Sequence, residues 1–181
     1  DTFSSRGLGD VYKRQILRPP IVESKENNMR IDSATRRNLE LTRSINTGAR
    51  QGSLLGTIDR TVTAAGGRLL ERRISSPSMD IGIINQRYDA LKFLYDKINL
   101  SESAMAFLKS VPDLERALSR VSLERAGPRD LANIYKGLIQ GKEIARLFKN
   151  HDVPAEIKLA LENLTGHDEG SSTLEKAIVP E

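Results

Sequence analysis

A glycine–lysine segment at residues 137–143 comes nearest to nucleotide chemistry in this chain. Gly137, Gly141 and Lys142 resemble a phosphate-binding loop, in which the backbone amides of a glycine-rich turn and a lysine face the phosphates. Only three residues separate the two glycines instead of four, and Glu143 stands where such a loop has the Ser or Thr that holds magnesium. The segment also continues an apolar helical stripe instead of following a strand. We therefore predict no nucleotide site here.

The two histidines each precede an aspartate, at residues 151–152 and 167–168. Imidazole beside carboxylate suits a metal site or acid–base chemistry. Adjacent residues do not face one another, however, and both pairs fall in expected loops where turn chemistry accounts for them. A metal or catalytic site also needs further converging ligands, which the sequence does not identify. We predict that neither pair forms such a site.

Residues 125–129, Arg-Ala-Gly-Pro-Arg, separate two expected helices and invite comparison with a helix-turn-helix motif. The following helix carries Asp130, Asn133 and Glu143, which give it no basic reading edge. The chain has no cysteine, so thiolate metal sites and thiol nucleophiles are excluded, and the aromatic residues mostly fall at expected core positions. We predict no catalytic, cofactor-binding or metal-binding residue, and the residues alone identify no DNA-contacting position.

The charge of the chain is unevenly distributed although its formal net value is only +4. Residues 30–73 contain nine arginines and four acids, which is +5, whereas the remainder carries 19 basic and 20 acidic residues, which is −1. Such a segment could bind phosphate or carboxylate, pair with acids of a neighbouring domain, or form a solvated helix face. With no cysteine, no secretory signal and no apolar run that could span a bilayer, we expect no membrane partner and a cytoplasmic protein.

The positions of capping and apolar residues predict a mainly α, irregular multi-helix fold with one short strand at residues 29–32. The expected N-caps are Asp32, Ser53, Thr63, Asp80 and Ser101, with Pro128 and Pro154 opening two later helices. The first helix should carry Leu39 and Leu41 and end near Gly48, and only one or two helical turns should follow Gly166.

Two long apolar stripes stand out in this helical pattern. They run from Ile81 to Ile98 and from Leu131 to Phe148, with apolar residues three or four positions apart. Such stripes are typical of helices that pack against neighbours. If some neighbours lie outside this chain, apolar surface stays exposed, so we predict marginal stability and self-association.

Three polar segments carry a resemblance to a known family. They are DSATRRNLEL at residues 32–41, TVTAAGGRLL at 61–70 and VPDLERALSR at 111–120. Their order and approximate spacing resemble the core helical (lever) domain, domain III, of the MutS family of DNA mismatch repair ATPases. The resemblance covers residues 17–181.

The resemblance implies a dimeric protein, expected here as a homodimer, that binds mismatched double-stranded DNA, couples this to ATP and magnesium, and signals to downstream mismatch-repair proteins. It implies that this portion is the structural link between connector, clamp and ATPase. The chain has no mismatch-wedging Phe-x-Glu motif and no intact Walker motif, so we expect no enzyme activity and no cofactor in it.

Three parts are expected along the chain. Residues 1–15 lack periodicity and are predicted to be disordered or non-native, residues 16–32 form a linker and short strand, and residues 33–181 form the first half of the core domain, incomplete at the C-terminus. The alternative from the residues alone is a free-standing α-helical scaffold that binds a protein through an exposed apolar groove.

Overall fold

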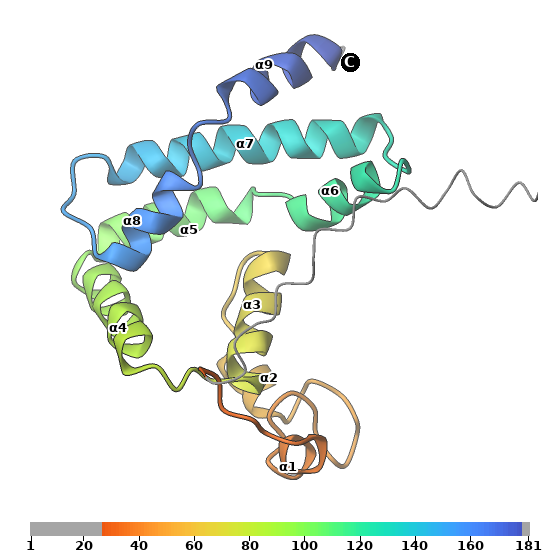
Figure 1. Ribbon diagram of the computed structural model, residues 1–181, viewed down its shortest axis with the longest axis vertical. Helices are drawn as coiled ribbons and strands as arrows, with labels where there is room; N and C mark the ends of the chain where they lie inside the picture. Colours follow the sequence, from red (N-terminus) through yellow and green to blue (C-terminus); the bar gives the residue numbers. More distant parts are fainter. Residues whose placement is uncertain (1–26, 179–181) are drawn as a thin grey trace, which may run out of the picture.

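The computed structural model describes residues 27–178, and this part of the chain is built from helices (Figure 1). The predicted helical class is therefore confirmed. In chain order the helices are α1 (Ser33–Asn38), α2 (Leu54–Ile58), α3 (Ala64–Ser75), α4 (Ile81–Asp96), α5 (Ile98–Lys109), α6 (Leu114–Ser122), α7 (Pro128–Phe148), α8 (Ala155–Glu162) and α9 (Asp168–Ala177). None of them is long and apolar enough to cross a lipid bilayer.

Four of the predicted N-caps are confirmed by their hydrogen bonds. The Asp32 carboxylate accepts from the amide of Thr35 at 2.8 Å, and the Asp80 carboxylate accepts from Gly82 at 2.8 Å. The hydroxyls of Ser53 and Thr63 accept from amides three residues later, at 3.1 and 3.0 Å. Each cap satisfies a donor that the first helical turn leaves without a partner, which fixes where these helices begin.

The predicted strand at residues 29–32 is wrong. None of these four residues is in a strand, and the residue before them, Asn28, forms an isolated antiparallel bridge with Ser78. The amide of Met29 donates to the carbonyl of Pro77, and the amide of Met79 donates to Asn27, both at 2.8 Å. Two such bonds join the chain just before α1 to the chain just before α4, but they are too few to form a sheet.

The first helix is shorter than predicted, because α1 ends at Asn38 and neither Leu39 nor Leu41 lies within it. The amide of Leu41 donates back to Arg36 at 3.2 Å and the amide of Glu40 to Arg37 at 3.0 Å, with Glu40 at a φ of +47°. This is the Schellman arrangement that ends many helices, here with glutamate in the left-handed position that usually holds glycine. The Glu40 carboxylate accepts from the amide of Ile45 at 2.6 Å, which holds the turn.

Three further boundaries differ from the prediction. Ser101 is not an N-cap, because α5 begins at Ile98, directly after a break at Lys97. The stripe that ran from Ile81 to Ile98 is therefore divided between α4 and α5. Gly166 is followed by the ten-residue helix α9 instead of one or two turns.

Helix α7 is the centre of the helical body (Figure 1). Helices α5 and α6 pack along one side of it and α9 along another, while α8 packs against α4 and the end of α7. The buried core joins Leu100 and Ala104 of α5 to Ile144 and Phe148 of α7. Since apolar residues of α7 recur at three- and four-residue steps, one helix can serve neighbours on several sides.

The stripe on α4 is largely exposed, although its aromatic residues were expected at core positions. Tyr88 and Tyr95 are 64% and 79% exposed, so these two aromatic residues are not core residues. Helix α4 instead packs through the neighbouring face that carries Leu94 and Phe93, which border the core. The period identified the helix correctly, but it did not identify which part of its apolar surface has a partner.

Candidate functional site

The glycine–lysine segment lies wholly inside α7, so its backbone amides belong to a continuous helix and cannot cradle a phosphate. Gly137 and Gly141 are both buried. A Cβ built on Gly137 would stand 2.3 Å from a methyl carbon of Leu114, and one on Gly141 would touch Leu164 at 3.5 Å. Gly137 therefore lets α6 approach α7 closely, whereas a Cβ on Gly141 would only make an ordinary contact with Leu164, just after α8.

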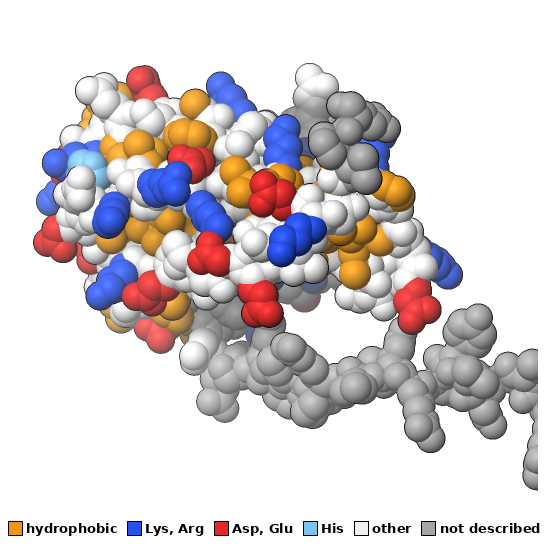
Figure 2. All heavy atoms as spheres, turned by 90° about the horizontal axis from the view of Figure 1, so that it is seen from above, with side chains coloured by type: hydrophobic (Ala, Val, Ile, Leu, Met, Phe, Trp, Pro, Cys, Tyr) orange, Lys and Arg blue, Asp and Glu red, His pale blue; other side chains and the backbone are white. Residues whose placement is uncertain are grey.

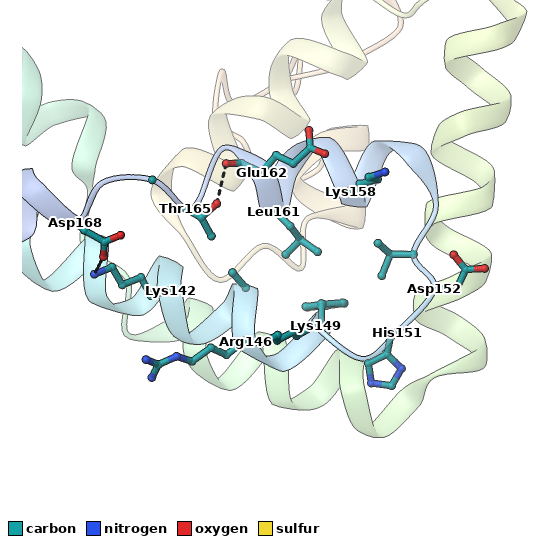
Figure 3. Close-up of a pocket in the computed structure, with 14 residues that line it drawn as sticks. Lys142, Arg146, Lys149, His151, Asp152, Lys158, Leu161, Glu162, Thr165 and Asp168 are labelled. Carbon is teal, nitrogen blue, oxygen red and sulfur yellow. Dashed lines mark hydrogen bonds and ion pairs between the residues drawn. The ribbon is translucent and has the colours of Figure 1, made fainter.

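A hollow bordered by many charged side chains lies between α7 and α8. This pocket has a volume of about 590 Å³ and is bordered by Lys142, Arg146, Lys149, His151, Asp152, Lys158, Glu162 and Asp168. Its charges are mixed, and Lys142 forms an ion pair with Asp168 that lowers the pKa of that carboxyl. Figure 3 shows Arg146 and Asp152 pointing away from one another, on opposite sides of the hollow. The groups do not converge on one point, as a catalytic or metal site requires.

Each histidine has a local structural role. His151 lies in the loop after α7 and packs edge to face on Phe93 of α4, with ring centroids 6.5 Å apart. The Nε2 atom of His167 lies 3.1 Å from the carbonyl oxygen of Asn163, at the start of α9. Among residues 27–178 no three His, Cys, Asp or Glu side chains are grouped so that they could hold a metal ion.

The turn at residues 125–129 is fixed by Asp130, whose side chain is almost fully buried. One carboxylate oxygen accepts from Arg120 at 2.5 Å and the other from the amide of Gly127 at 3.1 Å. Because α5, α6 and α9 all pack on α7, that helix is not free to enter a DNA groove. On the face over α7 and α9, basic and acidic side chains alternate instead of forming one basic area (Figure 2).

The arginine-rich segment divides into paired and unpaired residues. Arg68 and Arg73 of α3 pair with carboxylates of the helical body, and Arg50 pairs with Asp59. Arg43 and Arg60 donate to backbone carbonyls. No carboxylate within residues 27–178 lies in ion-pair range of Arg30, Arg36, Arg37 or Arg72. All four side chains are exposed, as a solvated helix face requires, and their binding of phosphate or carboxylate or of a neighbouring domain's acids stays a prediction.

Comparison with known proteins identifies the family. Residues 34–181 match the family described as MutS domain III. The chain belongs to the MutS family. It is 49% identical over 169 residues to the DNA mismatch repair protein MutS of Cereibacter sphaeroides and, over the same length, 49% identical to that of Ruegeria pomeroyi. In both comparisons 93% of this chain is covered but only 19% of the relative, so the chain spans about a fifth of the relatives' length.

Two of the three segments that resemble the MutS family meet in space. Arg68 lies in the second segment, and its guanidinium donates to both carboxylate oxygens of Asp113 in the third, at 3.0 and 2.7 Å. Its Nε donates to Glu115 at 2.8 Å. The fork of Arg68 lowers the pKa of Asp113 and the two carboxylates raise that of Arg68. Asp113 also caps α6, accepting from the amide of Arg116, so one carboxylate links the docking of α3 to the start of α6.

Sequence reasoning missed this contact in the MutS-type core because 45 residues separate its partners and no periodicity relates them. Arg73 forms a second connection, donating to Glu156 of α8 at 2.8 Å. Helix α3 thus reaches two different helices of the body through arginine. The signal in the sequence is that TVTAAGGRLL contains arginine and not lysine. The planar guanidinium of arginine favours two parallel hydrogen bonds to a carboxylate.

Proposed function

We propose that this chain is the first half of the core helical domain of a MutS-type protein that binds mismatched double-stranded DNA and couples that binding to ATP. The observation that carries the proposal is the match of residues 34–181 to MutS domain III. The relatives, which are about five times as long, are named as DNA mismatch repair proteins.

In this proposal the chain is a rigid structural link that relays displacements between other parts of the longer protein, and it catalyses no reaction. Helix α7 supplies a rigid rod of 21 residues with helices packed on several sides, and α3 is attached to that body through its arginines. A rigid element can relay a displacement between distant sites where a mobile loop cannot. ATP and magnesium would act in another part of the longer protein, and no residue here is assigned to DNA, nucleotide or catalysis.

The remaining features of the proposal follow from the family. The longer protein would be a cytoplasmic homodimeric ATPase that passes the mismatch signal to downstream repair proteins. Residues 33–181 would form the core portion and residues 16–32 a linker into it. The prefix predicted at residues 1–15, and most of that linker, lie outside the described residues.

A chimaera tests the proposal. The matching segment of the Cereibacter sphaeroides MutS would be replaced by residues 33–178 of this chain and expressed in cells that lack their own MutS. We expect the spontaneous mutation frequency to fall toward that given by the native relative, and mismatched DNA to alter ATP turnover in the purified chimaera. The same chimaera with Ile139→Pro, which breaks α7, is the control and should fail.

One result would contradict the proposal. In it the chimaera has native helix content and, in the absence of DNA, native ATP turnover, but its ATP turnover does not change when mismatched DNA is added. The second candidate, a free-standing helical scaffold, is favoured by one observation, the exposed apolar stripe on α4. If the chain were a scaffold, the chimaera would not respond to mismatched DNA, while the isolated chain would still bind a partner protein.

A further inference from the structure

Helices α1–α3 and the turns that join them, residues 27–79, form a unit that lies outside the apolar core of the body. The four core residues and the partly buried side chains packed on them all belong to residues 93–164. The unit buries Leu55 of its own, and within the described chain α3 packs closely on α2 and on no helix of the body. Figure 1 shows α1, α2 and α3 grouped on one side of α4–α9. The described chain therefore has two separate centres of packing.

Two arginines of α3 make the polar contacts between this unit and the body. Arg68 donates to Asp113 and Glu115 at distances from 2.7 to 3.0 Å, and Arg73 donates to Glu156 at 2.8 Å. Among residues 27–178, the other hydrogen bonds and ion pairs of the unit stay inside it, apart from one in the connecting turn at residues 78–80. We call the two arginines and their three carboxylates the arginine latch.

A hollow of about 740 Å³ lies where the unit meets the body. Arg73 and Pro77 border it from the unit, and α4, α5 and α8 supply most of its other walls. The Nε–H group of Arg73 is buried and has no hydrogen-bond partner within the described residues. A buried donor without an acceptor lowers the net stabilisation that a contact provides. The junction is therefore incompletely packed, and one of its two arginines is incompletely satisfied.

The forces that close the latch are electrostatic and open to solvent. The unit contains nine arginines and four acids, which is +5, whereas residues 80–178 contain 14 basic and 15 acidic residues, which is −1. The side chains of Arg68 and Arg73 are 35% and 39% exposed. Ion pairs this exposed are individually weak, and salt shortens the range of charge interactions from about 10 Å at 0.1 M to about 3 Å at 1 M. The attachment of the unit should therefore depend on ionic strength, whereas the apolar core of the body should not.

We propose that α1–α3 is a movable unit, which the arginine latch holds against the body and which moves away from α4–α9 when the latch opens. The pivot lies between Met79 and Asp80, in the turn that joins α3 to α4. Met29 and Asn27 are hydrogen-bonded to that turn just before the pivot, so the start and the end of the unit move together. The body keeps its core, and α7 stays a rigid rod, because no residue of the unit belongs to that core. This inference goes beyond the function proposed above and does not depend on it.

Distances between paired spin labels on the full 181-residue chain test this movement. The chain has no cysteine, so Glu71→Cys on α3 and Lys109→Cys at the end of α5 place one label on each side of the latch. We expect a compact distance distribution at about 0.1 M NaCl and a longer or broader one at about 1 M. Combining Arg68→Gln with Arg73→Gln should raise the population outside the compact distance at least about threefold at low salt, and the added effect of salt should then be lost.

Matched controls separate movement of the unit from unfolding. Arg72→Gln removes a charge from the exposed face of the same helix and should leave the compact distribution in place. A label pair inside the body, at Glu102 and Lys158, and a pair inside the unit, at Gln51 and Glu71, should keep their distances when both latch arginines are replaced. All four of these label sites are exposed.

Two kinds of result would overturn the proposal. In the first, the distance across the latch does not change when both arginines are replaced, or it changes equally with Arg72→Gln. In the second, the distances inside the body or inside the unit broaden as well, which would show that the chain unfolds and that α1–α3 does not move as one piece.

Discussion

At the scale of single residues, the glycines of α7 show how one residue type serves different ends. Gly137 and Gly141 have the composition of a phosphate loop but lie in a helix, where glycine normally costs about 1 kcal/mol relative to alanine. Gly137 is tolerated because Leu114 occupies the space that a side chain would need, whereas a Cβ on Gly141 would be in ordinary contact with Leu164. Close packing of two helices, and not ligand binding, therefore explains the glycine at position 137.

Substituting Gly137 by alanine should destabilise the protein in spite of the better helix propensity of alanine. The new methyl would lie within 3 Å of three Leu114 carbons, and such overpacking costs about 1–3 kcal/mol. Gly170→Ala in α9 is the matched control, since nothing lies within 4 Å of a Cβ there, and it should stabilise by up to about 1 kcal/mol. Urea unfolding measures both, and a stabilising Gly137→Ala would show that Leu114 moves aside without cost.

At the scale of elements, α3 is attached to the helical body by charge. Arg68 forks onto Asp113 and Glu115 at the start of α6, and Arg73 reaches Glu156 at the start of α8. Exposed ion pairs are individually weak, but a forked arginine on two carboxylates fixes both position and orientation. The start of α6 and the placement of α3 should therefore respond together to a change at either end of this contact.

The Arg68–Asp113 contact predicts a specific dependence of stability on pH. Arg68 lowers the pKa of Asp113 in the folded protein below its value of about 3.9 in the unfolded chain. The contact therefore stabilises the fold at pH values above the unfolded pKa, and this stabilisation is lost as the pH falls through the lower pKa that Asp113 has in the folded protein. Arg68→Ala should thus lower the free energy of unfolding at neutral pH, and this loss should become smaller in strong acid. In the variant, the NMR titration of the Asp113 carboxyl should move up toward its ordinary pKa.

Arg72→Ala is the control, because Arg72 lies on the exposed face of the same helix and forms no ion pair within residues 27–178. It should leave the Asp113 titration in place. If Arg68→Ala also left that titration unmoved, the fork would not form in solution.

At the scale of the whole molecule, the described helices form a body around α7 with charged groups spread over the surface and no converging set of reactive side chains. The charged pocket between α7 and α8 mixes lysines with acids, and its Lys142 is already paired with Asp168. Among residues 27–178, a nucleotide would find neither a free helix start after a strand nor a glycine turn with open amides.

The isolated chain should therefore not bind ATP. Titration calorimetry with ATP and magnesium should show no saturable binding with a dissociation constant below about 100 μM, which corresponds to roughly −5.5 kcal/mol. Lys142→Ala should give the same flat titration as the unmodified chain. A saturable signal that Lys142→Ala removes would restore the glycine–lysine segment as a nucleotide site.

The sequence by itself determined the helical class, four capped helix starts, the turn at residues 125–129 and the family, because caps, period and local motifs act over a few residues. It did not determine the ends of α1 and α4, since a left-handed Glu40 and a break at Lys97 depend on the neighbours that hold them. Only the tertiary structure decided that Arg68 meets Asp113 and that the apolar stripe on α4 faces water. Both depend on how distant segments pack, and periodicity reports that a residue is apolar without reporting whether a partner covers it.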